Sequence, residues 1–560
     1  MKKTERRYTK INSIKHMISL MYEKGDKTIF DYFDRNGAIQ TISFTAFADK
    51  IKAFGTGLHR TGLSQKRVAI IGETSPKWYI AYLATIAYGG VSIPMDKELA
   101  LPEIENFLKR SGAQAIVFSP LFEEKFADMA KRHPEITFIP MEACPGKKGY
   151  ASSMDALINL GAARVSEPPA PADMDRMTVM LFTSGTTGTS KCVMLSERNI
   201  CTSINAACES VDFYPEDVLV SVLPVHHTYE LCCSLAAANY GCEIAINDSL
   251  RHVMRNFAKF RPTALILVPL FLNTMDKKIW EEIRKKKKEP FVRKMMSVSD
   301  RIYGYGLDVR RILFKEIIAA FGGRLRKIIC GGAPLNQEIA QDFRSLGINV
   351  WEGYGITECS PLISVDVYYH SKPGSVGPAV PGCKVYIDGC ETNEAGYTVG
   401  EICVKGKNVM LGYYEDPKAT EAVFTKDGYF RTGDVGYLDE EGYIYITGRK
   451  KSVIVLENGK NVFPEEIEEY LESIEQIAES VVVGRPSKDK DSIILTAIIY
   501  PDFSRFPEDA TAEEIAAKLK DEINRMNKRL VGYKQIRAIE VRSTEFEKTT
   551  TKKIKRHLVH

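Results

Sequence analysis

The sequence lacks the features that would place this chain in a membrane, outside the cell or on a nucleic acid. No stretch approaches the roughly 18 apolar residues of a membrane span, and no apolar run typical of a signal peptide follows the basic N-terminus. The 12 cysteines show no paired metal or redox spacing, since Cys232 and Cys233 are merely adjacent. A net charge of +4 is small beside 148 charged side chains and does not indicate nucleic acid. We expect a cytoplasmic protein with reduced thiols.

The length of 560 residues predicts two or more structural units. Short apolar runs alternate with helical patterns, which predicts parallel strands joined by crossover helices. The predicted strands are 68–71, 91–94, 115–118, 178–182, 219–223, 264–268 and 327–330, with helices at 76–88 and 102–110. Ligands bind at the carboxyl ends of such strands, so we expect the chemistry in the loops that follow them.

The pattern changes near residue 383, where glycines separate short alternating runs typical of antiparallel strands. Further on, 464–474 and 512–529 are typical of helices, and 480–484 and 493–500 of strands. We therefore predict an α/β fold with a large N-terminal domain of parallel-type βα sheets and a small mobile α+β C-terminal domain. The predicted bounds are 1–447 for the first domain, 383–447 for its antiparallel, β-barrel-like subdomain, 448–452 for a hinge and 453–560 for the second domain.

A hydroxyl-rich loop follows the apolar run at 178–182 and reads TSGTTGTSK from Thr183 to Lys191. Its two glycines let the backbone bend and approach a ligand closely. Amide, hydroxyl and ammonium donors together suit phosphate oxygens. The loop is not a Walker A motif, because two residues separate Gly188 from Lys191. We interpret it as a phosphate-binding loop of another kind, and its alternative is a flexible Ser/Thr/Gly surface loop.

Two further segments could contact a nucleotide, and the first of them directly follows a predicted strand. Gly332 and Ala333 follow the strand at 327–330 and expose backbone on which a flat ring can lie. The segment WEGYGITE, residues 351–358, offers Tyr354 for stacking on a base and Glu358 as a hard oxygen ligand for magnesium. Each segment alone is also compatible with ordinary turns and packing.

Two motifs occur further towards the C-terminus. The segment RTGD offers Asp434, and an acidic residue at a strand end can hold both hydroxyls of a ribose, although Gly-Asp is also ordinary turn chemistry. Arg449 opens the charged stretch 449–451. The basic tail 547–556 reads EKTTTKKIKR, a composition that by itself indicates only a solvated or anion-binding segment.

In their order and over nearly the whole chain, these motifs resemble the adenylate-forming superfamily of acyl-CoA synthetases, luciferases and adenylation domains. Within it, the chain looks most like the long-chain fatty-acid–CoA ligases. The stretches that carry this closer resemblance are LPVHHTYEL at 223–231, GGRLRKIICGGAPL at 322–335 and VLENGKNVFPEEIE at 455–468.

The resemblance implies a role for each matching position. Catalytic roles fall on Lys553, which would bridge the carboxylate and the α-phosphate, on Glu358, and on His227 beside the acyl pocket. Magnesium would be held by Thr183 and Glu358, and Lys451 would be the hinge. The implied nucleotide-binding residues are Thr183, Ser184, Gly185, Thr186, Thr187, Gly188, Lys191, Gly332, Ala333, Tyr354, Gly355, Thr357, Asp434 and Arg449.

The implied reaction activates a fatty acid with ATP and Mg²⁺ as an acyl-adenylate and passes the acyl group to coenzyme A. The acyl pocket would be lined near His227, 269–272, Gly331 and 359–362. The tail departs from the family pattern, because Glu547 stands where proline is usual and Lys552 where glycine is usual. We favour Lys553 over Lys552 because Ile554 and Arg556 follow it at the family spacing.

Several alternatives stay open. The acyl acceptor could be the thiol of acyl carrier protein instead of coenzyme A. Two other classes are a standalone amino-acid adenylating enzyme and a catalytically silent acyl- or nucleotide-binding protein. A homodimer and a peripheral contact with the inner membrane surface are also open. The basic run 284–288 is typical of a solvated helix face, and its alternative is attraction to anionic lipid head groups.

Overall fold

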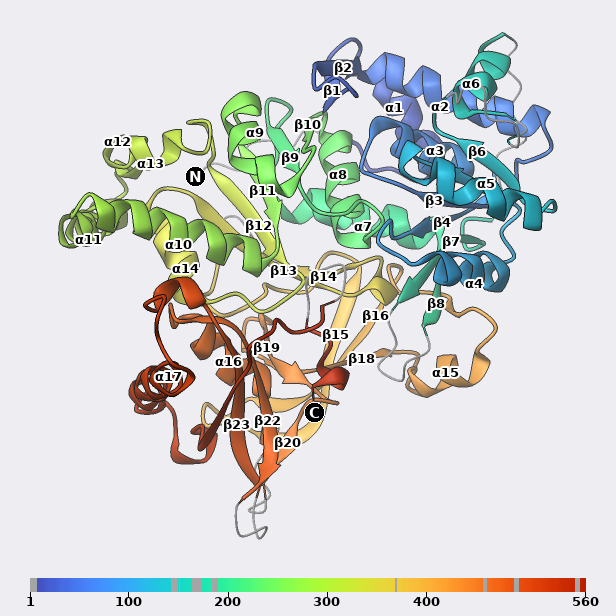
Figure 1. The fold of residues 1–560 in the computed structure, drawn as a ribbon. Coiled ribbons are helices and arrows are strands. Elements are labelled where there is room, and N and C mark those ends of the chain that lie inside the picture. The colour runs from blue at the N-terminus through green and yellow to red at the C-terminus, as the bar shows by residue number, and fades with distance from the viewer. Residues whose placement is uncertain are drawn as a thin grey trace.

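The computed structural model describes residues 8–142, 150, 152–163, 173–183, 190–367, 370–456, 461–487, 493–548 and 554–559. Two α/β sheets with their helices form the N-terminal part, and an antiparallel sheet and the C-terminal unit lie against one side of it (Figure 1). The predicted α/β class, with a large N-terminal domain and a small α+β C-terminal domain, is confirmed. Among the described helices, none has both the length and the apolarity needed to cross a bilayer.

The first sheet has seven strands in the order β17-β8-β7-β4-β3-β5-β6. Neighbouring strands from β7 to β6 run parallel, whereas β8 pairs antiparallel with both β7 and β17. Helices begin where the sequence predicts, as at Pro76, where the Ser75 side chain accepts a hydrogen bond from the Trp78 amide. The elements are β3 (Arg67–Ile71), β4 (Val91–Met95), β5 (Ala115–Phe118), β6 (Thr137–Pro140), β7 (Met177–Thr183), β8 (Lys191–Ser196), β17 (Gly412–Tyr413), α2 (Phe44–Arg60), α3 (Pro76–Ala87), α4 (Leu101–Ser111), η1 (Pro120–Phe122), α5 (Glu123–Arg132) and α6 (Met154–Ala162).

The second sheet has eight strands in the order β14-β13-β12-β11-β9-β10-β1-β2, and only its two edge strands, β14 and β2, pair antiparallel. Its strands are β1 (Thr28–Phe33), β2 (Ile39–Ser43), β9 (Val218–Ser221), β10 (Glu243–Ile246), β11 (Ala264–Leu267), β12 (Lys327–Gly331), β13 (Asn349–Gly355) and β14 (Leu362–Val365). Its helices are α1 (Ile14–Tyr22), α7 (Glu197–Ser210), α8 (Thr228–Tyr240), η2 (Leu250–His252), α9 (Val253–Phe260), α10 (Pro269–Lys285), α11 (Glu289–Gly304), α12 (Arg310–Leu313), α13 (Lys315–Ala319) and α14 (Gln337–Ser345).

The largest apolar core joins the two sheets through α3, α7 and α8. Trp78 and Tyr82 of α3 stack 5.6 Å apart, and Leu231 of α8 is buried in the same core. Because this core is continuous, the carboxyl ends of strands from both sheets are held in a fixed relation to one another.

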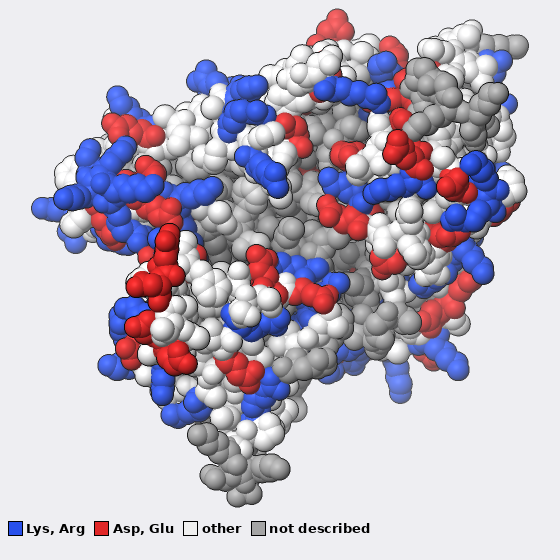
Figure 2. Space-filling view, viewed as in Figure 1, with Lys and Arg blue, Asp and Glu red and all other residues white. Residues whose placement is uncertain are grey.

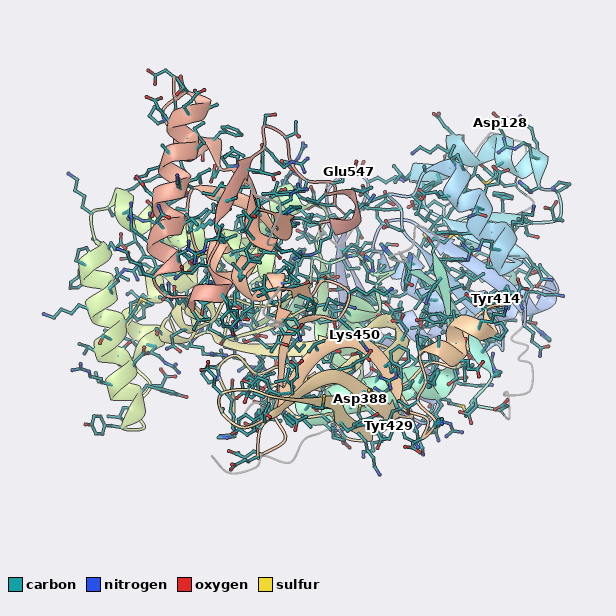
Figure 3. All side chains as sticks on the ribbon, turned by 90° about the horizontal axis from the view of Figure 1, so that it is seen from below. Asp128, Asp388, Tyr414, Tyr429, Lys450 and Glu547 are labelled. Carbon is teal, nitrogen blue, oxygen red and sulfur yellow. The ribbon has the colours of Figure 1, made fainter. Side chains whose placement is uncertain are left out.

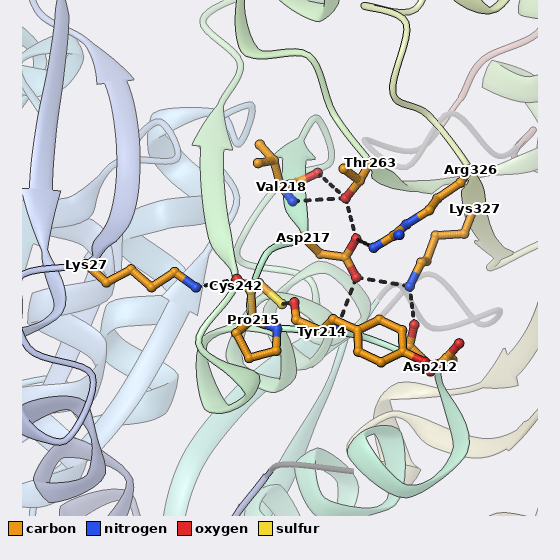
Figure 4. Close-up of polar contacts among 10 residues, drawn as sticks. All are labelled: Lys27, Asp212, Tyr214, Pro215, Asp217, Val218, Cys242, Thr263, Arg326 and Lys327. Atoms are coloured by element: carbon orange, nitrogen blue, oxygen red, sulfur yellow. Dashed lines mark hydrogen bonds and ion pairs between the residues drawn. The ribbon is translucent and has the colours of Figure 1, made fainter. Parts of the chain in front are cut away.

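A buried ion pair fixes the amino ends of the central strands of the second sheet (Figure 4). The carboxylate of Asp217 lies 3.0 Å from the Lys327 ammonium and 2.6 Å from the Arg326 guanidinium, and it accepts a hydrogen bond from the Thr263 hydroxyl. Burial raises the pKa of Asp217, but Lys327, Thr263 and Arg326 outweigh burial and hold it below its ordinary value. This network lies at the end of the sheet opposite to the expected chemistry.

The antiparallel sheet has the order β15-β16-β18-β19, and its last strand runs to Arg449. Its elements are β15 (Cys383–Thr392), β16 (Thr398–Gly406), α15 (Pro417–Ala422), β18 (Phe430–Leu438) and β19 (Ile444–Arg449). The C-terminal unit has β20 (Ile454–Val455), β21 (Asn461–Val462), α16 (Pro464–Glu472), β22 (Ile477–Pro486), β23 (Ile493–Pro501), η4 (Phe503–Arg505), α17 (Ala512–Asn527), η5 (Gly532–Lys534), β24 (Ala538–Val541) and η6 (Arg556–Leu558).

Polar contacts hold the C-terminal unit against α10 and α14. The Asn273 amide donates to Glu472 over 3.1 Å, Arg284 lies 2.6 Å from Glu475, and Arg529 lies 2.8 Å from Glu338. Such interfaces separate more readily than a shared apolar core, so they are compatible with the mobility that the sequence predicts.

Candidate functional site

The loops after β12 and β13 lie next to each other because these strands are parallel and in register, with Gly331 paired to Gly353. Gly332 has a φ of +87°, a left-handed conformation that favours glycine, and Ala333 follows it. Gly355 is required by packing, since a Cβ there would lie 2.3 Å from the Pro361 carbonyl oxygen. The predicted adenine-binding residues therefore share one sheet edge, and Thr357 begins the short helix η3 (Thr357–Cys359) beside them.

Tyr354, Asp434 and Arg449 form the first polar cluster of the site. The Tyr354 hydroxyl donates to Asp434 Oδ2 over 2.6 Å, and Arg449 Nε lies 2.7 Å from Asp434 Oδ1. Strand pairing places Asp434 directly opposite Arg449. Burial and the neighbouring carboxylate raise the pKa of Tyr354 well above its usual value, so it stays a hydrogen-bond donor. Each carboxylate oxygen keeps capacity for a further hydroxyl donor.

Lys191, Tyr413 and Glu358 form the second cluster. The Lys191 ammonium lies 4.4 Å from the centre of the Tyr413 ring, and the Tyr413 hydroxyl donates to Glu358 Oε1 over 3.0 Å. Burial and the Glu358 carboxylate raise the pKa of Tyr413 above its usual value. Tyr413 was not among the predicted site residues. Its position results from the pairing of β17 with β8, two strands more than 200 positions apart, and no local sequence pattern indicates that pairing.

The hydroxyl-rich loop begins and ends on two paired strands. Thr183 at the end of β7 pairs with Lys191 at the start of β8, and the Thr183 hydroxyl lies 3.5 Å from the Lys191 carbonyl oxygen. The intervening predicted residues Ser184, Gly185, Thr186, Thr187 and Gly188 lie outside the described residues. Thr183 lies on β7, which pairs with β8, and Glu358 lies in η3, which contacts β8. The Thr183 hydroxyl and the Glu358 carboxylate therefore come from neighbouring elements. Hard oxygen donors of this kind suit Mg²⁺.

His227 precedes α8 and stands beside a second histidine that the sequence analysis did not single out. The rings of His226 and His227 lie 4.1 Å apart, and His226 Nε2 is 3.4 Å from Asp96 Oδ2 at the end of β4. One ligand atom from each of the three residues lies within 4.8 Å of the others. Because His226 and Asp96 contact each other, we interpret their contact as one that positions the loop carrying His227.

A small apolar cavity lies behind these histidines. Its lining includes Tyr82, Leu181, Leu231 and Leu235, together with His226 and Ser360. Its volume is about 20 Å³, so an acyl chain can enter only if side chains move. Of the predicted pocket lining, only the range 359–362 contributes, through Ser360. Apart from His226, the remaining lining residues come from α3, α7, α8 and the first sheet, and no local sequence pattern marks them as pocket residues.

The C-terminal tail is anchored on both sides of its predicted lysine. Lys548 and Ile554 form an antiparallel bridge, and the Lys555 amide donates to the Glu547 carbonyl over 2.8 Å. Arg556 also pairs with Glu468 of α16. Figure 3 places Glu547 on the C-terminal unit and Lys450, next to the predicted hinge residue Lys451, beside the antiparallel sheet. Lys553 and Lys552 lie outside the described residues.

Comparison with known proteins identifies the family. The AMP-binding enzyme family matches residues 21–414, and the AMP-binding enzyme C-terminal domain matches residues 451–560. The chain belongs to the AMP-binding enzyme family. The resemblance to the adenylate-forming superfamily is thereby confirmed. The polar clusters described above belong to an adenylate-forming enzyme.

The similar proteins agree with this membership. Human long-chain-fatty-acid–CoA ligase 1 is 29% identical over 502 residues, covering 82% of this chain and 69% of the relative. The Mycobacterium tuberculosis long-chain-fatty-acid–CoA ligase FadD15 is 27% identical over 474 residues, covering 80% and 76%. Among solved structures, ATP-bound MatB from Rhodopseudomonas palustris is 26% identical with a TM-score of 0.73, over 98% of both chains.

Proposed function

We propose that this AMP-binding enzyme activates a fatty acid with ATP as an acyl-adenylate and transfers the acyl group to the thiol of coenzyme A. The observation that carries the proposal is a pair of polar clusters, Tyr354–Asp434–Arg449 and Lys191–Tyr413–Glu358. They meet where β13 ends, because β13 carries Tyr354 and η3, which carries Glu358, follows it directly. The first offers a carboxylate to ribose hydroxyls. The second offers a cation and a carboxylate at the mouth of the phosphate-binding loop.

The charges of the second cluster suit the first half-reaction. A carboxylate must attack an anionic phosphorus, so the two reactants repel each other. Lys191 at the start of β8, and Lys553 in the tail, would offset this repulsion by stabilising negative charge at the phosphates. Mg²⁺ held by Thr183 and Glu358 would supply further charge stabilisation when bound. Positioning and electrostatics then account for the rate without a covalent protein intermediate.

The cysteines nearest the site support transfer to an external thiol. Cys330 lies in the fully buried strand β12, and Cys359 lies in η3. Burial raises the pKa of both thiols well above their usual value. A protonated, buried thiol is a poor nucleophile. The acyl group is therefore expected to pass directly from the adenylate to a thiol that enters from solvent.

The apolar cavity and the relatives both favour a fatty acid. Most side chains that line the cavity are apolar, and no Asp, Glu, Lys or Arg is among its described lining residues to pair with a charged acyl substituent. Similar proteins named long-chain-fatty-acid–CoA ligases are 26–29% identical to this chain. Chain length is left to experiment, because the cavity has to open before it holds any acyl chain.

The decisive test measures exchange of labelled pyrophosphate into ATP with acids of two to eighteen carbons, followed by thioester formation with coenzyme A and acyl carrier protein in parallel. We expect exchange that depends on fatty acid and thioester formation with coenzyme A. Thioester only with acyl carrier protein would establish the alternative acceptor. Exchange only with amino acids, or no AMP with any acid, would refute the proposal.

Replacing Lys553 by alanine separates the two half-reactions. We expect adenylate formation to be lost while supplied acyl-adenylate is still converted to thioester, because only the first step brings the carboxylate to the α-phosphate. Lys552→Ala is the matched control and should retain adenylate formation. An equal loss of both half-reactions in Lys553→Ala would show that Lys553 has another role.

A further inference from the structure

A basic and apolar surface covers the end of the molecule formed by α11 and α12, which we call the α11 face. Residues 284–315 contain eleven Lys and Arg against three Asp and Glu, a net charge of +8, so the rest of the chain carries a net charge of −4. Figure 2 shows basic side chains gathered at the left end of the molecule, where Figure 1 places α11. The net positive charge of the chain therefore comes from one short segment.

The same segment exposes most of its large apolar side chains. Among the described residues, the four most exposed large apolar side chains all belong to it: Tyr305 at 90%, Ile312 at 74%, Leu307 at 65% and Phe291 at 62%. Isolated exposed apolar residues are ordinary on soluble proteins, but their concentration in one place marks an interaction site.

Apolar and basic residues share one face of α11. Phe291, Lys294, Val298, Arg301 and Tyr305 follow one another at three- and four-residue intervals, which places them on one side of the helix. Their side chains are exposed, whereas Val292, Met296 and Ser299 on the opposite side are buried. Basic residues interleaved with apolar ones are typical of helices that lie in a membrane interface.

Part of the positive charge is neutralised within the protein. Arg284 pairs with Glu475 and Arg310 with Asp308. Lys286, Lys287, Lys288 and Lys294 have exposed side chains at the start of α11 and just before it. These lysines can approach an anionic surface without unfolding any element.

We propose that the α11 face docks on the surface of an anionic lipid bilayer, with Phe291, Leu307, Tyr305 and Ile312 entering the interface and the lysines contacting lipid phosphates. Charge alone would also suit a nucleic acid, and Phe291 and Tyr305 can stack on bases, but the exposed aliphatic side chains of Leu307 and Ile312 offer no such stacking surface. Fatty acids partition into bilayers, so docking would place the enzyme where such a substrate is concentrated. The binding itself does not depend on the proposed reaction.

Vesicle sedimentation of the full chain without ATP or acid tests the proposal. We expect binding to vesicles of equimolar phosphatidylcholine and phosphatidylglycerol, little binding to phosphatidylcholine alone, and weakening at high salt. Lys288→Glu with Lys294→Glu should weaken binding about 30-fold or more, since each cation near the surface contributes about fivefold. Phe291→Ser with Ile312→Ser should weaken it about tenfold, because apolar burial is lost.

Matched controls use exposed residues of the C-terminal unit. Lys520→Glu with Lys528→Glu, and Val455→Ser with Val531→Ser, should bind vesicles like the unaltered protein. Comparable losses in the control pairs would overturn the assignment of the face. Equal binding to both vesicle types would overturn the role of charge.

A tryptophan at position 291 reports insertion directly. The three native tryptophans, Trp78, Trp280 and Trp351, are buried, so the new fluorophore is the exposed one. We expect Phe291→Trp to show a blue shift on anionic vesicles and quenching by brominated acyl chains. Binding without a blue shift or quenching, together with equally tight binding to single-stranded RNA, would indicate a polyanion site and refute membrane docking.

Discussion

Replacing Asp434 by asparagine removes the charge at the centre of the Tyr354–Asp434–Arg449 cluster while keeping the size of the side chain. Oδ2 accepts from the Tyr354 hydroxyl over 2.6 Å and Oδ1 lies 2.7 Å from Arg449 Nε. Both oxygens would each accept one ribose hydroxyl if the proposed site is correct. Asparagine keeps one acceptor oxygen and turns the other position into a donor.

The expected loss follows from these hydrogen bonds. A hydrogen bond to a charged acceptor contributes about 1.5–3 kcal/mol. Asparagine retains one neutral acceptor, so we expect a total loss of about 3 kcal/mol in nucleotide recognition, or roughly 100-fold in kcat/KM for ATP. The loss should fall mainly on KM, because the ribose is held alike in the ground state and the transition state.

The assay compares ATP with 2′-deoxyATP and 3′-deoxyATP in pyrophosphate exchange. The unaltered enzyme should prefer ATP about tenfold or more over at least one deoxynucleotide, since one charged hydrogen bond is missing. In Asp434→Asn this preference should shrink to a few-fold. Comparing the two enzymes with ATP and with each deoxynucleotide gives a double-mutant-type cycle, which separates the contact between carboxylate and ribose from other effects of the substitution.

Asp439→Asn is the matched control, because Asp439 follows the same strand, is similarly buried and pairs with Lys372 over 2.6 Å. It should change thermal stability without changing nucleotide preference. If Asp434→Asn loses activity but discriminates between ATP and the deoxynucleotides as before, Asp434 does not contact the ribose and our account of the cluster is wrong.

Three further predictions concern neighbouring features. Tyr413→Phe keeps the ring under Lys191 but removes the hydrogen bond to Glu358, so a magnesium titration of pyrophosphate exchange should show a midpoint about tenfold higher, and an unchanged midpoint would contradict the role of Tyr413. Asp217→Asn should lower the free energy of unfolding, measured in urea near neutral pH, by about 3 kcal/mol without altering KM for ATP. Because folding lowers the pKa of Asp217, its stabilising contribution is present above the ordinary pKa of 3.8 and is lost as acid protonates the carboxylate. Burial raises the pKa of Glu230 from 4.5 to about 7. The free energy of unfolding should therefore fall by about 3 kcal/mol as the pH rises from the ordinary to the raised pKa, and Glu230→Gln should abolish this pH dependence.

Much of the fold and part of the site could be predicted from local patterns. A four-residue apolar run such as 115–118 is β5, and the serine and proline at 75–76 begin α3. Parallel strands bring their carboxyl ends to one edge, so predicting β12 was enough to expect ligand contacts in the loop at Gly332. β13 was not predicted as a strand, and its pairing with β12 is what brings Tyr354 beside Gly332. The antiparallel pairing of β8 with β7 was not predicted, because the composition of a hydroxyl-rich loop does not indicate whether the strands on either side of it are parallel or antiparallel.

Residues that reach the site through distant pairing could not be predicted. Tyr413 depends on a two-residue strand, β17, and His226 on a contact with Asp96 across more than a hundred positions. Neither has a periodic signal, because a pair or a single side chain is too short to show one. The long-range contacts of the core decide these positions.

The lining of the acyl pocket could not be predicted, because the sequence does not distinguish apolar residues of the core from those that line a cavity. Its predicted lining followed loops after strands, whereas the cavity lies between α7, α8 and the first sheet, among side chains that look like ordinary core. An apolar residue that packs the core and one that contacts an acyl chain obey the same burial energetics, so composition cannot separate them. The difference lies in packing, because a lining residue must exchange protein contacts for acyl contacts at little net cost. Leu231 and Leu235, one helical turn apart on α8, are therefore the positions where a change in side-chain volume should alter chain-length preference first.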